Sequence, residues 1–93
     1  MSTPTLHARA IWVSEHYWPG VADELVLAQA QRLAGVEGCV RAIVLSGQET
    51  VIGLYEAGTA AEVQGRLAAV GLATEVVQPG WSLDPSTTLE TSS

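Results

Sequence analysis

Two amphipathic segments, each closed by a glycine, most constrain the fold of this 93-residue chain. The first, residues 21–35, repeats apolar side chains at helical spacing and ends at Gly35. Asp23 and Glu24 stand in its first turn and Arg32 in its last, which complements the helix dipole. The segment therefore predicts a helix. Its apolar face consists of Val26, Ala30 and Leu33.

The second segment, residues 58–72, begins with a capping box. Thr59 and Glu62 stand at the spacing at which the hydroxyl and the carboxylate each satisfy a free amide of the first turn. Gly71 marks the end of this predicted helix. Its apolar stripe consists of Ala60, Val63, Leu67 and Val70.

Short segments rich in β-branched and aromatic residues surround these helices and predict strands. They are residues 8–14, 39–45, 50–57 and 73–79. The middle two are joined by SGQE, a glycine-containing link of hairpin length. The order β-α-β-β-α-β predicts an α+β, ferredoxin-like fold. Right-handed crossovers would place both helices on one face of a four-stranded antiparallel sheet.

The strand segments AIWV, AIVL and VIGLY are continuously apolar, which is typical of strands covered on both faces. The hydrophobic content of 47% also exceeds what a polar-surfaced monomer of this size needs. We therefore expect a homodimer. Two copies would pack sheet to sheet as a dimeric α+β barrel and enclose a pocket for a small apolar metabolite.

We expect one domain over residues 8–79, between a flexible N-terminus, residues 1–7, and a flexible tail rich in Ser, Thr and Pro, residues 80–93. The net charge of −6 and the scattered arginines argue against a nucleic-acid partner. The sequence shows no basic, apolar leader and no apolar run of bilayer length. These features favour a cytoplasmic protein without a membrane partner.

The motifs SEHYWPGV, VIGLYEAGTAAEV and AAVGLATEVVQ resemble those of a small bacterial ferredoxin-like family described as nickel-binding or of unknown function. In that family an apolar strand ending in a triplet such as YEA precedes a helix, and a Gly-Leu link precedes the last strand. The likeness covers residues 8–79. It implies a small stand-alone dimer and nickel as a bound metal, and it assigns no individual ligands.

The residues themselves offer few nickel ligands. Ni(II) favours several imidazole and oxygen ligands gathered at one site. His7, His16 and Cys39 are the imidazole and thiol groups of the chain, and they form no H-x-H, H-x3-H or C-x-x-C motif. A buried, inert thiol is the simpler interpretation of Cys39. We therefore expect no cofactor, with nickel binding as the alternative.

His16 is the first candidate catalytic residue, placed just past the predicted end of the first strand. A histidine is well suited to move a proton near neutral pH, and Glu15 or Glu56 would orient or charge it. If the strand continues, Glu15 and His16 point to opposite faces. A turn histidine and solvated carboxylates remain open as the plainer alternatives.

Aromatic residues and one arginine are the candidates for substrate binding. They are Trp12, Tyr17, Trp18, Arg41 and Tyr55. Arg41 interrupts an apolar strand, so under a covered sheet it needs an anion, either Glu56 or a ligand carboxylate or enolate. Gly53 leaves space in a central strand, as at a bulge or a cavity floor. Packing alone also accounts for the aromatic residues.

The chain has no G-x-G-x-x-G, P-loop or G-x-S-x-G motif, which argues against nucleotide-dependent and triad mechanisms. We expect a cofactor-independent enzyme of the cyclase, isomerase or monooxygenase type. It would act by acid–base chemistry on an apolar, natural-product-like metabolite, by analogy with other dimeric α+β barrels. The alternative is a non-catalytic protein that binds nickel or a small ligand.

Overall fold

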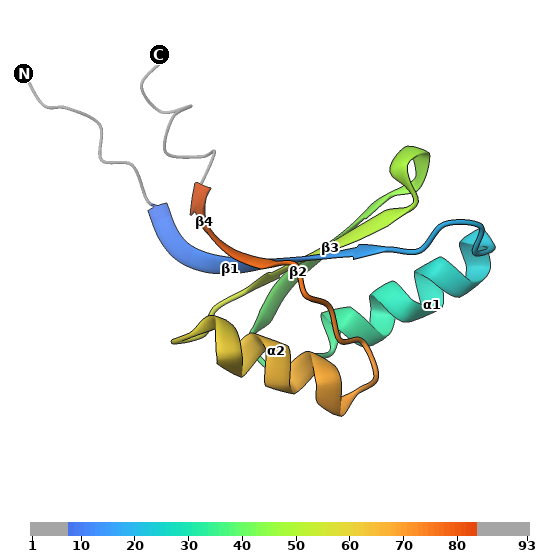
Figure 1. Cartoon of the computed structure of the whole chain (residues 1–93). Coiled ribbons are helices and arrows are strands. Elements are labelled where there is room, and N and C mark those ends of the chain that lie inside the picture. Colours follow the sequence, from blue (N-terminus) through green and yellow to red (C-terminus); the bar gives the residue numbers. More distant parts are fainter. Residues whose placement is uncertain (1–7, 84–93) are drawn as a thin grey trace, which may run out of the picture.

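The computed structural model describes residues 8–83, which form one sheet and two helices (Figure 1). The strands are β1 (Ala8–Tyr17), β2 (Cys39–Leu45), β3 (Thr50–Tyr55) and β4 (Val77–Leu83), and the helices are α1 (Asp23–Ala34) and α2 (Ala60–Ala69). A 3-10 turn, η1 (Ser46–Gln48), joins β2 to β3. The N-terminal segment predicted to be flexible, and residues 84–93 of the predicted tail, lie outside the described residues.

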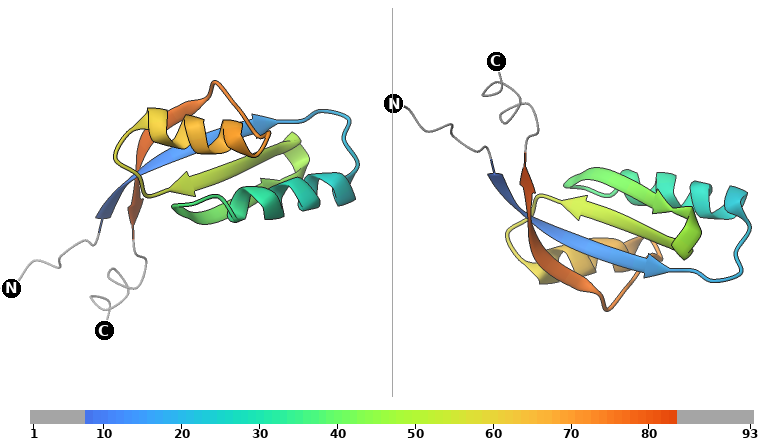
Figure 2. Two further views of the ribbon diagram at one scale, coloured as in Figure 1. Left: turned by 90° about the horizontal axis from the view of Figure 1, so that it is seen from below. Right: turned by 90° about the horizontal axis from the view of Figure 1, so that it is seen from above.

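Neighbouring strands are all antiparallel, and their spatial order is β2-β3-β1-β4. β3 and β1 therefore form the centre of the sheet, and β2 and β4 form its edges. Both helices cover the same face and leave the other face without a helix (Figure 2). The prediction of an α+β, ferredoxin-like fold with a four-stranded antiparallel sheet is confirmed.

The buried apolar core lies between the sheet and the helices. Leu33 of α1, Leu67 of α2 and Val51 of β3 are completely buried. Burying a leucine side chain contributes about 1.5–3 kcal/mol relative to exposure, so these contacts hold the helices on the sheet. Val70, expected in the second apolar stripe, is exposed because it caps the end of α2 instead of lying inside the helix.

The capping box at the start of α2 forms as predicted on its hydroxyl side. The Glu62 backbone amide donates to Thr59 Oγ1 at 3.2 Å. The Glu62 carboxylate accepts from the amide of Gly58, one residue earlier than the capping box places it, at 3.3 Å. α1 has no such side-chain cap, so its position depends on packing and on its terminal charges.

The first strand is longer than the sequence predicted. Beyond Ser14, the ladder with β3 continues through Glu15, His16 and Tyr17, and the Glu15 amide donates to the Val76 carbonyl oxygen at 3.0 Å. The expectation that His16 lies past the strand end is therefore wrong. His16 is a strand residue with a fixed direction.

The last strand begins and ends later than residues 73–79. The Thr74 hydroxyl donates to the Glu15 carbonyl oxygen at 2.7 Å, so this stretch is tied to β1 before regular pairing starts at Val77. Pairing then runs past residue 79 to Leu83, because the first residues of β1 provide a partner. Pro79 is tolerated in this edge strand. Neither helix of residues 8–83 is long and apolar enough to cross a membrane.

Candidate functional site

The sheet face opposite the helices carries a cavity of about 710 Å³. We call this side of the sheet the open face; it bears Arg9 and Ile11 of β1, Arg41 and Ile43 of β2, Leu54 of β3, and Glu56 just after β3. These side chains line the cavity. Its lining combines apolar side chains, such as Ile11, Ile43 and Leu54, with charged ones. Two of the chain's four cationic side chains are among them.

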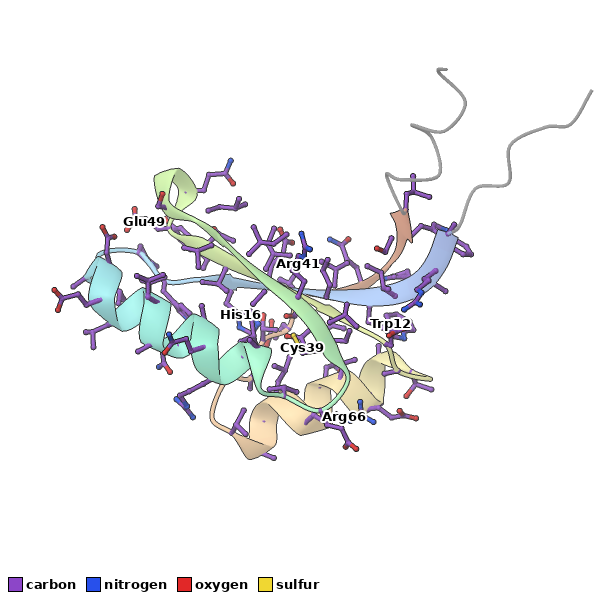
Figure 3. The ribbon with its side chains drawn as sticks, turned by 180° about the vertical axis from the view of Figure 1, so that it is seen from behind. Trp12, His16, Cys39, Arg41, Glu49 and Arg66 are labelled. Carbon is purple, nitrogen blue, oxygen red and sulfur yellow. The ribbon has the colours of Figure 1, made fainter. Side chains whose placement is uncertain are left out.

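A β-bulge decides which β2 side chains reach this cavity. Cys39 pairs with Tyr55 and Arg41 pairs with Leu54, so the register shifts between them. In a regular strand, residues two apart share a face. Here the bulge turns Arg41 to the open face while Cys39 stays on the helix side. Figure 3 shows His16 and Cys39 between the sheet and the helices, and Arg41 on the other side.

The Glu56 carboxylate is bound by Arg9, not by Arg41. Arg9 Nη1 lies 3.1 Å from Glu56 Oε2. The two side chains are 70% and 48% exposed. The ion pair therefore contributes little to the stability of the fold, about 0–1 kcal/mol, as is typical of surface pairs. The other carboxylate oxygen, Oε1, makes no hydrogen bond with the described residues.

A second polar group lies under the helices, inside the core. Ser14 Oγ is 2.8 Å from His16 Nε2 and 2.8 Å from Tyr55 Oη. Ser14 and Tyr55 are completely buried and His16 is 3% exposed. The His16 ring also packs against the indole of Trp18, with ring centroids 5.4 Å apart. Within residues 8–83, every fully buried side-chain nitrogen and oxygen has a hydrogen-bond partner.

Gly53 makes room for this network. A Cβ atom at Gly53 would lie 2.1 Å from Tyr55 Oη and 2.9 Å from Ser14 Oγ, far inside van der Waals contact. The tyrosine ring therefore lies back over the glycine of its own strand. The space expected at Gly53 is filled by the Tyr55 hydroxyl, on the helix side of the sheet.

Burial controls the protonation of these groups. It lowers the pKa of His16, and no charged side chain contributes to that change. Burial raises the pKa of Tyr55 to about 12, although the hydrogen bond between Tyr55 and Ser14 opposes the increase. Burial also raises the pKa of the Cys39 thiol. Near neutral pH the network therefore consists of a neutral imidazole, a hydroxyl and a neutral phenol.

The predicted site residues divide between the two faces. Trp12, His16, Trp18 and Tyr55 lie on the helix side, and Glu15, Tyr17, Arg41 and Glu56 lie on the other. Within one protomer, His16 and Glu56 are therefore separated by the sheet. Trp12 has a structural partner, because its indole Nε1 donates to the Ala57 carbonyl oxygen at 3.2 Å.

Of the predicted residues, Arg41 and Glu56 line the cavity of the open face. Sequence reasoning missed Arg9, Ile11, Ile43 and Leu54. The sequence showed which of these residues alternate along a strand, but not which face of the sheet they occupy. That face depends on the strand register, and a shift of one residue moves every side chain to the opposite face. Arg9 carried a signal as well, since it is a cation near the start of an otherwise apolar predicted strand.

A smaller cavity of about 300 Å³ lies on the helix side, between the loop after β1, the start of α1 and the turn after β2. Trp18, Val26 and Val44 contribute to its apolar lining. Glu49 fixes the loop: its carbonyl oxygen accepts from the Trp18 amide at 2.9 Å, and its carboxylate accepts from the Gly20 amide. Glu49 itself adopts the left-handed region, with φ of 52°.

Among residues 8–83, no three His, Cys, Asp or Glu side chains come together as a metal site. The resemblance to a nickel-binding family therefore finds no supporting donor cluster in this part of a single protomer. Nickel binding stays a prediction. In comparisons with known proteins, no family model, curated protein or solved structure matches this chain.

Proposed function

We propose that two copies of the chain pack through their open faces and enclose a chamber that holds a small, largely apolar molecule. The observation that carries this proposal is the cavity of about 710 Å³, lined by apolar and charged side chains, which is within the size range of small-molecule sites. Two of the apolar side chains that line this cavity are exposed in one protomer, Ile43 by 37% and Val40 by 49%. Exposed apolar side chains beside a cavity favour a partner, and a second copy is the occupant we propose.

A second copy suits this face better than a helix or an extended peptide. Two antiparallel sheets can pack face to face with their inner side chains interdigitated. The open face carries apolar side chains of β1, β2 and β3 together with both signs of charge, on Arg9, Arg41 and Glu56 around the cavity and on Glu15 farther along β1. A twofold arrangement brings the same patch from each copy together, so that neither copy encloses the chamber alone.

We assign the acid–base chemistry of the proposed enzyme to Glu56. Arg9 holds Oε2 of the carboxylate, and Oε1 is left to meet a ligand. In this proposal Glu56 takes a proton from an acidic C–H bond of the bound molecule and returns it at the same or another atom. Such a step needs no cofactor and corresponds to isomerisation or to the first step of a cyclisation.

His16 has a different place in the proposal. It lies 2.8 Å from the Ser14 hydroxyl on the helix side, so it does not face the chamber. Its role in this proposal is to hold the Ser14 hydroxyl, which contacts Tyr55 of β3. The acid–base step therefore depends on Glu56 and its Arg9 partner.

Deuterium exchange tests the assignment. The full chain is incubated in D₂O with 2-tetralone, an apolar ketone with acidic C–H bonds, and deuterium uptake is followed by mass spectrometry. We expect the wild-type chain to accelerate uptake and Glu56→Gln to fall to the buffer rate. Glu75→Gln, which removes an exposed carboxylate away from the cavity, is the control and keeps the wild-type rate. Equal rates for wild type and Glu56→Gln would contradict the role of Glu56.

A further inference from the structure

We infer that Arg41 binds an anionic group of the molecule held in the chamber, so that the ligand is an apolar organic acid or an enolate. This inference rests on the proposed function and specifies its ligand class. Three observations support it: the bulge that directs Arg41, the lack of a partner for its guanidinium, and the charge balance of the cavity.

The bulge in β2 gives Arg41 a direction that a regular strand would deny it. Cys39 pairs opposite Tyr55 on the helix side, and a regular ladder would put Arg41 on that side too. The register shift moves Arg41 opposite Leu54, onto the open face. β-Bulges commonly re-aim a side chain beside a functional site, at a local cost in ladder hydrogen bonds.

Arg41 also differs from the other arginines in its contacts. All four arginines lie within residues 8–83. Arg9 binds Glu56, Arg32 binds Gln29 and the Val70 carbonyl oxygen, and Arg66 binds the Glu37 and Glu62 carboxylates. Within the same described residues, the Arg41 guanidinium makes no hydrogen bond or ion pair.

The cavity is locally positive in an acidic protein. The chain carries a net charge of −6, yet the ionisable lining of the cavity consists of Arg9, Arg41 and Glu56. Because Arg9 already neutralises Glu56, the positive charge of Arg41 is left over. When a second copy covers the face, an unpaired guanidinium would lose water without compensation, which is costly. An anion on the ligand removes that cost.

The geometry of the guanidinium favours an oxygen anion. Its planar set of N–H donors matches a carboxylate or an enolate with a neighbouring oxygen, and it accepts nothing itself. The apolar side chains of Ile11, Ile43 and Leu54, which also line the cavity, would contact the rest of the molecule. The ligand class is therefore an apolar body with one anionic head.

A matched pair of probes tests this inference by isothermal titration calorimetry on the full chain. 2-Naphthoate carries the anionic head, and 2-naphthamide is its neutral analogue of similar shape. A charge-assisted hydrogen bond contributes about 1.5–3 kcal/mol, so we expect the wild-type chain to bind naphthoate about 10- to 100-fold more tightly. Arg41→Gln should remove this preference while binding of the amide is kept, and Arg41→Lys should restore part of it.

Arg32→Gln is the control, since it removes the same charge on the helix side of the molecule. It should keep the preference for naphthoate. Equal binding of the two probes by wild type and Arg41→Gln would overturn the inference and leave the chamber in place. Failure of the wild-type chain to bind either probe would contradict the proposed function itself. If Arg41→Gln turns dimers into monomers, Arg41 pairs across the interface and the inference is wrong.

Discussion

The Ser14 hydroxyl oxygen lies 2.8 Å from Nε2 of His16, two positions farther along the same strand, and both side chains are buried beneath the helices. Strand alternation brings them to one face, and Ser14 is also bonded to Tyr55 of the neighbouring strand. Ser14 is therefore the middle member of a three-residue chain of hydrogen bonds. Neither end of that chain has another bond from its side chain to the described residues.

Removing the middle member should cost more than removing an end. Ser14→Ala leaves both His16 Nε2 and the Tyr55 hydroxyl without a partner, whereas Tyr55→Phe leaves the bond between Ser14 and His16 intact. A buried polar group without a partner costs about 1–3 kcal/mol. We expect Ser14→Ala to lower the free energy of unfolding by about 1–3 kcal/mol more than Tyr55→Phe, measured by urea denaturation. Equal losses would show that the network does not act through Ser14.

The buried imidazole should make the fold sensitive to acid. The pKa of His16 is lowered by burial, whereas in the unfolded chain it is near the ordinary value of 6.5. Below that pH the unfolded chain binds a proton that the folded chain does not, so the free energy of unfolding falls as the pH drops. One proton limits the slope to about 1.4 kcal/mol per pH unit. Above pH 6.5 both states are neutral and the contribution vanishes.

The comparison that isolates this effect is between wild type and His16→Gln, unfolded in urea at several pH values between 5 and 8. Carboxylates titrate in both proteins, so the difference between the two curves reports His16. We expect that difference to be constant above pH 6.5 and to shrink below it, because the variant has no imidazole to protonate. A difference that stays constant throughout would contradict a neutral, desolvated His16.

Gly53 should be the least replaceable glycine of the sheet. In Gly53→Ala the new Cβ would lie 2.1 Å from Tyr55 Oη and 2.6 Å from Tyr55 Cζ, so the ring must leave its site. Overpacking of this kind costs about 1–3 kcal/mol, and loss of the hydrogen bonds adds to it. Thermal unfolding followed by circular dichroism measures the loss.

Gly65→Ala is the matched control for that substitution. Gly65 lies in α2 and has nothing within 4 Å of its would-be Cβ. Because alanine favours a helix by about 1 kcal/mol over glycine, this variant should be more stable than wild type. If both variants change stability by the same amount, the close approach of Tyr55 to Gly53 is not what makes the glycine necessary.

The fold was predictable because its signals are local. These signals are the glycines that end the two helices, the terminal charges of α1 and the capping pair Thr59 and Glu62. Each acts within a few residues, and each predicted its helix correctly. Strand ends were less predictable. Whether β1 continues beyond Ser14, or β4 to Leu83, depends on partners distant in sequence.

The site was predictable only in part, because the face of each strand residue depends on register. Glu15 and His16 were expected on opposite sides, and they are. The pairing that places Tyr55 with Trp12 under the helices, and the bulge that turns Arg41 away from them, are long-range features. No periodicity in the sequence distinguishes a bulged β2 from a regular one. The candidate residues predicted for a single site therefore lie on opposite faces of the sheet.

The oligomeric state tests the central claim most directly. Sedimentation equilibrium of the full chain should give twice the mass of one chain, and Ile43→Glu should give monomers, because it puts a charge on the open face. Leu25→Glu is the control, because Leu25 is 61% exposed on α1, on the side of the sheet away from the open face. This variant should remain a dimer. Ile43 is 37% exposed in one protomer, so the single chain should tolerate the charge. A wild-type chain that sediments as a monomer, or an Ile43→Glu chain that remains a dimer, would contradict the sheet-to-sheet chamber.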